Sequence, residues 1–267
     1  MLFANYHTHT PRCNHARGEE REYIEAAIQA GYQLLGFSDH SPYVFENGHD
    51  SGFRMKLEET ENYVSTLQAL RREYEKDITL LIGFEAEYYP RLFAKTLAFL
   101  HPFDYDFLLL GQHFTVNETD GVSVNLPMTD GDLHQFVDQT CQAMHTGAFT
   151  YFNHPDMPLH TGSPAAYERE MTRLCQTALE TDTPLELNLL GIRGKRNYPH
   201  EPFWEIVQQI GNPVIIGVDA HDPRNLDHRE ALDEALKLVE KYRLRLIDRV
   251  PIKDPHTCAL AKELNLC

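Results

Sequence analysis

The sequence predicts an α/β fold in which about seven strands alternate with helices in one domain over residues 1–267. Short apolar runs bounded by turn signals alternate with longer amphipathic stretches, a pattern typical of βαβ units with a buried parallel sheet. The alternation continues without a Gly-, Pro- or Ser-rich linker. We therefore expect either a (β/α) barrel or a doubly wound sheet.

The order of the elements follows from these runs. Predicted strands cover residues 2–6, 33–37, 79–82, 106–110, 148–152, 184–189 and 213–218. Predicted helices lie near residues 19–30, 56–76, 92–100, 132–145, 165–181, 202–210 and 228–242. Residues 254–267 predict a short terminal helix.

Composition excludes several classes of protein. The chain has 42% hydrophobic and 24% charged residues, which is ordinary for a globular domain. Its formal charge of −16 disfavours long nucleic acids as partners. No secretory leader and no run of about 18 apolar residues is present, so we expect a cytoplasmic protein without a membrane partner. Five cysteines without CxxC spacing predict reduced thiols rather than a disulfide framework.

Histidines and carboxylates follow the predicted strands at their C-terminal ends. His7 and His9 follow the first strand, His40 the second, Glu85 the third, His113 the fourth, His154 the fifth, and Asp219 and His221 the seventh. Because the C-terminal ends of parallel strands meet at one mouth, these side chains are expected to converge. A lone histidine is more often a surface or core residue, and the shared position is what favours a site.

The spacing and chemistry of these residues predict a metal site. His7 and His9 lie two positions apart on extended chain and therefore share a face, as do Asp219 and His221. Imidazole and carboxylate ligands suit zinc, manganese or iron. With His15 in the first loop there are too many ligands for one four-coordinate ion, so we expect two or three divalent ions. Glu85 is the expected bridge, because it has two oxygens and follows a central strand.

Eight segments in sequence order resemble a known family. They are residues 7–10, 13–15, 37–41, 83–88, 111–113, 153–156, 186–188 and 217–221. Together they resemble the polymerase and histidinol phosphatase (PHP) family of metal-dependent phosphoesterases, and within it the histidinol-phosphate phosphatase branch. The resemblance implies a distorted seven-unit (β/α) barrel, similar to a TIM barrel.

The resemblance also implies how the ligands divide among three ions. His7, His9, Glu85 and Asp219 would hold the first ion, Glu85, His113 and His154 the second, and His15, His40 and His221 the third. His15 enters this set mainly through the resemblance. The implied reaction, part of histidine biosynthesis, is hydrolysis of L-histidinol phosphate by a hydroxide held between two ions that lower its pKa.

Three further residues are candidates for contacts with a small phosphorylated substrate or for proton transfer. Arg193 is the expected phosphate ligand, because related phosphatases carry an arginine in a similar Asn-x-x-Gly-x-Arg context. His160 lies six residues beyond His154, near the same mouth, and could touch the substrate. Asp39 either orients the imidazole of His40 or moves protons.

Two departures from the related phosphatases bear on the substrate. Gln112 stands within a segment that often reads Gly-Ser-Val-His, and Leu159 and His160 stand where a basic residue is frequent. Two alternatives therefore remain open. One is a phosphoesterase that acts on nucleotides or another small ester, and the other is a metal-binding module without turnover.

Overall fold

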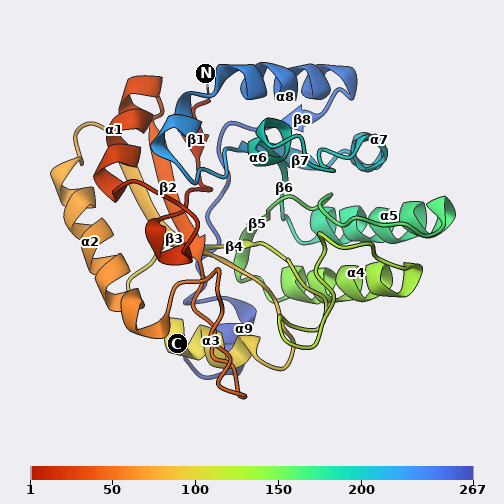
Figure 1. Ribbon diagram of the computed structural model, residues 1–267, viewed down its shortest axis with the longest axis horizontal. Helices are drawn as coiled ribbons and strands as arrows, with labels where there is room; N and C mark the ends of the chain where they lie inside the picture. The colour runs from red at the N-terminus through yellow and green to blue at the C-terminus, as the bar shows by residue number, and fades with distance from the viewer. Residues whose placement is uncertain (1, 267) are drawn as a thin grey trace.

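Eight parallel strands, in the order in which they occur in the sequence, form one curved sheet within residues 2–266, the part of the chain that this computed structural model describes (Figure 1). The strands are β1 (Ala4–Asn5), β2 (Leu34–His40), β3 (Thr79–Ala86), β4 (Phe107–Leu110), β5 (Phe149–Phe152), β6 (Leu185–Asn188), β7 (Pro213–Gly217) and β8 (Arg245–Leu246). The sequential order distinguishes a barrel-like sheet from a doubly wound one, in which the strand order reverses.

Helices lie around the outside of the sheet (Figure 1). They are α1 (Glu20–Ala30), α2 (Thr60–Glu73), α3 (Phe93–Leu100), α4 (Asp130–His145), α5 (Pro164–Glu180), α6 (Leu189–Arg193), α7 (Glu201–Ile210), α8 (Arg229–Lys241) and α9 (Ala259–Glu263). Three short 3-10 helices, η1 (Pro11–Cys13), η2 (Leu57–Glu59) and η3 (Pro223–Asp227), lie in the connections. Local signals set several ends: α1 stops at Gly31, which adopts a left-handed φ of 88°, and the Thr129 side chain caps α4.

The first and seventh strands meet beyond their regular ends. Thr8 and Ala220 form a parallel bridge, and the Ala220 amide donates to the carbonyl oxygen of His7 at 3.1 Å. The two-residue β8 pairs with β7 at its opposite end, through Pro213 and Val214. The sheet is thus drawn together at the C-terminal ends of the strands, where the predicted ligands lie.

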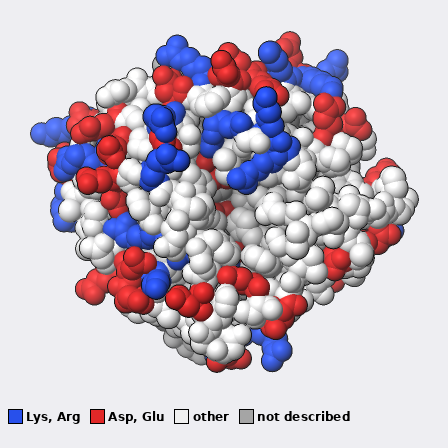
Figure 2. Space-filling view, viewed as in Figure 1, with Lys and Arg blue, Asp and Glu red and all other residues white. Residues whose placement is uncertain are grey.

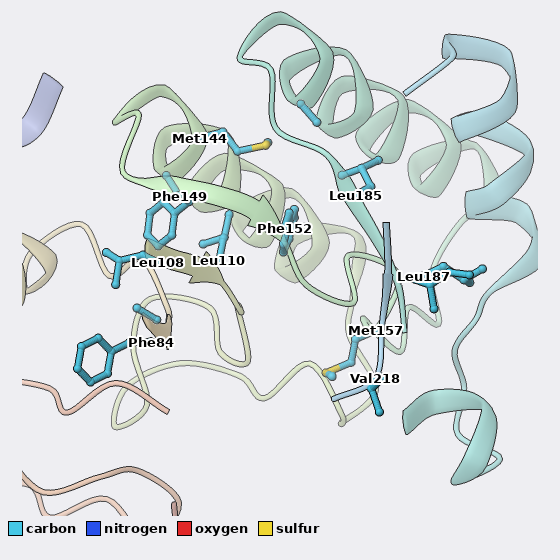
Figure 3. Close-up of a cluster of buried hydrophobic side chains, with 14 of the residues drawn as sticks. Phe84, Leu108, Leu110, Met144, Phe149, Phe152, Met157, Leu185, Leu187 and Val218 are labelled. Carbon is cyan, nitrogen blue, oxygen red and sulfur yellow. The ribbon is translucent and has the colours of Figure 1, made fainter. Parts of the chain in front are cut away.

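Side chains on alternate residues of β4 separate two apolar clusters. Phe107 and Leu109 point into the sheet's interior, in a small cluster with Tyr6 and Tyr151. Leu108 and Leu110 point outward into the large cluster beneath the helices, part of which is drawn in Figure 3. The interior is therefore filled below the mouth, as in a barrel that is a packed core rather than a pore.

Most predicted elements have a counterpart, and the exceptions have physical reasons. Each of the seven predicted strands is present, but β8 was not predicted because it has only two residues and is not buried. No helix was predicted between residues 189 and 202, whereas α6 covers Leu189–Arg193 because the Asn188 side chain caps its first turn. The terminal helix is shorter than predicted, and Cys267 lies outside the described residues.

No helix within residues 2–266 is both long enough and apolar enough to cross a membrane. Cys13, Cys141 and Cys175 are free and buried, and Cys258 is buried as well.

Asn5 links the two strands that meet at the mouth. Its side chain is fully buried, and its Oδ1 accepts a hydrogen bond from the Val218 amide at 2.9 Å. Its Nδ2 donates to Thr8 Oγ1 at 2.9 Å and to the His7 carbonyl oxygen. One side chain thus satisfies the backbone of both strands next to the first predicted ligand.

We predict that Asn5→Ala lowers the free energy of unfolding by about 2 kcal/mol, because buried polar groups lose their partners. Urea denaturation measures the change. Asn47→Ala, in an exposed loop, is the matched control and should lower the free energy of unfolding by less than about 0.5 kcal/mol. Equal effects of the two substitutions would contradict this role of Asn5.

Candidate metal centre

The structure brings all nine predicted ligands to one end of the sheet. His40 and Glu85 lie on β2 and β3, His113 follows β4 and His154 follows β5. The others are His7, His9 and His15 after β1, and Asp219 and His221 after β7. Residues more than 200 positions apart therefore face one another across the mouth.

Glu85 lies at the middle of this group and is 1% exposed. Five imidazoles lie within 4 Å of its carboxylate oxygens: His7, His9, His40, His113 and His154. The shortest approach, 3.0 Å, joins Oε1 to His154 Nε2, whereas Oε2 faces His40 Nδ1 at 3.1 Å. Both oxygens are thus used, on different sides, as a bridging carboxylate requires.

Asp219 faces the same space from the other side. Its Oδ1 lies 3.3 Å from His9 Nε2 and 3.2 Å from His221 Nδ1. Its Oδ2 accepts a hydrogen bond from Asn188 Nδ2 at 3.1 Å, which leaves Oδ1 directed at the imidazoles. His7 Nε2 lies 3.6 Å from the same oxygen.

His15, His40 and His221 form the outer part of the group. The Nε2 atoms of His15 and His221 are 3.0 Å apart, and the ring centroids of His15 and His40 are 5.3 Å apart. The His9 ring stacks on His221 at 4.0 Å, which joins this trio to the residues around Glu85. The nine side chains therefore make one continuous cluster.

The cluster suits divalent cations on two grounds. Several buried polar atoms have no hydrogen-bond partner within residues 2–266, namely both ring nitrogens of His9, Nδ1 of His40 and of His154, and Oδ1 of Asp219. Such atoms are costly unless something else binds them. Moreover, ligand atoms of His9, His40 and His221 lie within 4.8 Å of one another, as do those of His7, His9 and Glu85. The nitrogen and oxygen donors fit zinc, manganese or iron.

A second layer of carboxylates supports the imidazoles. Glu186 Oε1 lies 2.8 Å from His7 Nδ1, and Glu87 Oε1 lies 2.8 Å from His113 Nδ1. Both glutamates are fully buried. Such pairs fix the ring orientation and leave Nε2 free to bind a metal. Neither glutamate was predicted; the available signal for Glu87 was its two-residue spacing from Glu85.

Asp39 belongs to this second layer as well, although its partner differs from the one expected. Its Oδ1 lies 3.5 Å from His9 Nδ1, and its other oxygen accepts a hydrogen bond from the Thr10 hydroxyl. It reaches His40 only through the backbone amide, at 2.8 Å. The carboxylate is fully buried and faces His9, so the geometry points to orientation of His9 rather than of the His40 ring.

Backbone geometry is adapted to this packing. A Cβ atom at Gly111 would lie 2.0 Å from Glu85 Oε1, and one at Gly217 would lie 1.7 Å from Glu186 Oε1, so only glycine fits at either position. His154 and Asp219 have φ values of 31° and 52°, in a region that residues with a side chain rarely adopt. Strain of this kind concentrates at functional sites.

The electrostatics keep the two central carboxyl groups ionised. Burial disfavours a charge on His7, but Asp219, Glu186 and Glu85 outweigh burial and raise the pKa of its imidazole to about 10. Burial likewise opposes the charges of Glu85 and Asp219, yet the surrounding histidines hold the pKa of each carboxyl well below its usual value. The mouth therefore presents ionised oxygens to a cation.

A cavity of about 460 Å³ opens above the cluster. Besides predicted ligands it is lined by Gly52, Phe53, Asn125, Met157, Leu190, Arg196 and Tyr198. Figure 2 shows this face, on which Lys and Arg side chains gather on one side of a central hollow although the chain carries a net charge of −16. The volume is that of a small-molecule site.

The structure does not place Arg193 or His160 in the lining of this cavity. Arg193 donates hydrogen bonds through Nη1 and Nη2 to the carbonyl oxygens of Val218 and Asp219, at 2.7 and 2.9 Å. His160 Nε2 lies 2.7 Å from an oxygen of Asp130. Among the lining residues that the structure describes, Arg196 is the only Lys or Arg. Arg196 was not among the substrate contacts predicted from the sequence.

The departures noted in the sequence also lie outside the lining. Gln112 is 1% exposed, accepts a hydrogen bond from the Tyr88 amide and donates one to the Phe114 carbonyl oxygen. It therefore holds the loop after β4. Leu159 pairs its backbone with Met128 and Val124 and does not line the cavity either.

Comparison with known proteins decides the family. A family profile described as "PHP domain" matches residues 5–189, more than half of the chain. The chain belongs to the PHP family. This confirms the resemblance seen in the sequence motifs, and the matched region contains seven of the nine predicted ligands.

Individual PHP relatives agree with this. A probable histidinol-phosphatase from Deinococcus radiodurans is 28% identical over 232 residues, 84% of this chain and 88% of that protein. The DNA polymerase/3'-5' exonuclease PolX of Bacillus subtilis is 29% identical over 78% of this chain, but only 32% of that protein. The crystal structure of a Lactococcus lactis histidinol phosphate phosphatase with zinc, L-histidinol and phosphate aligns with a TM-score of 0.71 and 16% identity, covering 94% of this chain and 99% of that one. This last likeness shows that the two chains share a fold.

We predict that Glu186→Gln weakens metal binding by about 10- to 100-fold, because His7 loses the carboxylate that orients its ring. Metal retained per chain after dialysis against a graded series of chelator concentrations measures this. The control is Glu180→Gln, at the exposed end of α5. If both variants retain metal as the unmodified protein does, Glu186 does not support the centre.

Proposed function

We propose that this chain is a metal-dependent phosphomonoester hydrolase and that its substrate is L-histidinol phosphate. The observation that carries the proposal is the position of the nine-residue cluster at the floor of a small cavity with a cationic side chain at its wall. Membership of the PHP family and the names of its relatives support the same reaction. The chain would act as one domain, a seven-unit barrel with β8 as an added strand, in the cytoplasm.

Two or three divalent ions would occupy the cluster. We assign His7, His9, Glu85 and Asp219 to the first, Glu85, His113 and His154 to the second, and His15, His40 and His221 to the third. The contacts around Glu85 and the close approach of His15 to His221 support this division. When bound, such ions lower the pKa of water and neutralise charge on a phosphoryl group.

The chain's own residues would position the reactants. The guanidinium of Arg196, which donates from Nη1 to the Tyr198 hydroxyl at 3.2 Å, would bind phosphoryl oxygens from the cavity wall. Arg193 would act indirectly, by holding the backbone at Asp219 in its left-handed conformation. Glu186, Glu87 and Asp39 would keep three imidazoles in the orientation that faces the cavity.

A second candidate is a phosphoesterase that acts on nucleotides, and the similarity to PolX is the observation in its favour. The small volume of the cavity and the charge of −16 disfavour long polynucleotides but not mononucleotides. Assays of oligonucleotides and nucleoside monophosphates beside histidinol phosphate distinguish the two. Normal metal content with no turnover of any ester would instead indicate a binding module.

We predict that the protein loaded with zinc, manganese or iron releases phosphate from L-histidinol phosphate. Removal of the ions by a chelator should abolish release, and the same ions added back should restore it. Inorganic phosphate is measured at each step. Release that persists in the fully chelated protein would contradict a metal-dependent reaction.

We predict further that Arg196→Ala raises KM for the phosphomonoester about tenfold or more, because a charge-assisted hydrogen bond to phosphate is lost. The neighbouring exposed Lys195 does not line the cavity, so Lys195→Ala should change KM less than about twofold. Steady-state kinetics of both variants and of Arg193→Ala provide the comparison. A large rise in KM for Arg193→Ala and none for Arg196→Ala would reverse the assignment.

A further inference from the structure

The cavity has an aromatic wall that no metal ligand provides. Phe53 lies in the loop that leads from β2 towards α2 (Figure 1), is partly exposed and lines the cavity. Its ring meets the His40 ring edge to face at 5.3 Å and stacks on Phe114 at 6.0 Å. A phenylalanine ring therefore stands directly beside the cluster, in the wall of the cavity.

The position of Phe53 is held by a buried arginine. Arg54 is 2% exposed, and its guanidinium lies 4.4 Å from the centre of the Phe53 ring. It donates to Glu87, to Glu118 Oε2 at 2.9 Å and to the Tyr89 hydroxyl at 3.1 Å. Glu87 in turn contacts His113, so one chain of charged contacts connects the loop to the cluster. A buried arginine whose three guanidinium nitrogens each donate a hydrogen bond fixes the loop in one place.

The rest of the wall is chiefly apolar. Met157, Leu190 and Tyr198 line it together with Asn125 and Arg196. Among the lining residues described by the structure, the only carboxylates are Glu85 and Asp219, and both lie within the cluster. The wall therefore offers faces of rings and apolar groups to an organic substituent, but no separate anion to pair with an ammonium group.

We propose that Phe53 is a specificity-determining residue that recognises a flat ring on the leaving alcohol, and that an ammonium group on that alcohol is not recognised. The inference rests on the proposed function and deepens it. The substrate class is a phosphomonoester of a short alcohol that bears a planar ring, of which L-histidinol phosphate is one member. Ring stacking on Phe53 supplies the preference.

Three esters, assayed with the metal-loaded, unmodified protein, distinguish recognition of the ring from recognition of the ammonium group. They are L-histidinol phosphate, its analogue without the ammonium group, and 2-aminopropyl phosphate, which keeps the ammonium group and has no ring. We expect kcat/KM for the analogue within about threefold of that for histidinol phosphate. For the ringless ester, kcat/KM should be about tenfold lower than for histidinol phosphate, which is the size of effect expected when an aromatic contact is lost.

Substitutions at Phe53 then test the residue itself. Phe53→Leu should raise KM for both ring-bearing esters about tenfold and leave kinetics of the ringless ester unchanged, whereas Phe53→Tyr should restore the preference because it keeps the ring. Phe99→Ala, which removes a ring on α3 outside the cavity lining, is the control.

The outcomes are distinguishable. Two results would overturn the role of Phe53 while leaving phosphatase activity established. One is that turnover is lost only when the ammonium group is removed. The other is that Phe53→Leu affects ring-bearing and ringless esters equally. If the unmodified, metal-loaded protein hydrolyses none of the three esters, the proposed function itself fails and the inference fails with it.

Discussion

Two buried carboxylates, those of Glu85 and Asp219, impose the constraint on which the rest of the structure depends. Isolated buried charges are strongly unfavourable unless they are paired or bind metals. Here they are surrounded by imidazoles, several of which have ring nitrogens without hydrogen bonds. The arrangement is favourable when cations lie between these groups. The mouth of the sheet is therefore a site prepared for metal rather than a stabilising core.

Much of the surrounding structure serves to hold this arrangement in place. Glu186 and Glu87 bind the outer nitrogens of two imidazoles, and glycine at 217 leaves room for one of these carboxylates. Asn5 joins the strands that carry the first and last ligands, and Arg193 binds the carbonyl oxygens next to Asp219. The interactions that close the barrel and those that orient the ligands are largely the same.

The sequence predicted the location of the cluster because strand ends of a parallel sheet must meet, so position along the chain was sufficient for residues such as His40 and Glu85. It did not reveal that Arg193 faces the backbone and Arg196 the cavity, because this depends on how the chain turns at the end of α6, a short helix with no clear periodic pattern. His160 was chosen by its distance in sequence from His154, yet its contact with Asp130 holds it outside the cavity lining. Such long-range side-chain partners leave no local signal.

The most direct measurement of the central claim is anomalous diffraction from crystals of the protein grown with zinc or manganese. The account predicts two or three peaks among the nine side chains, at about 2.0–2.2 Å from imidazole nitrogens and carboxylate oxygens. Two of the peaks should each lie within this distance of a carboxylate oxygen of Glu85. An empty mouth in crystals that hold the metal at other positions, for example beside His134 and Asp138 between α4 and α5, would contradict it.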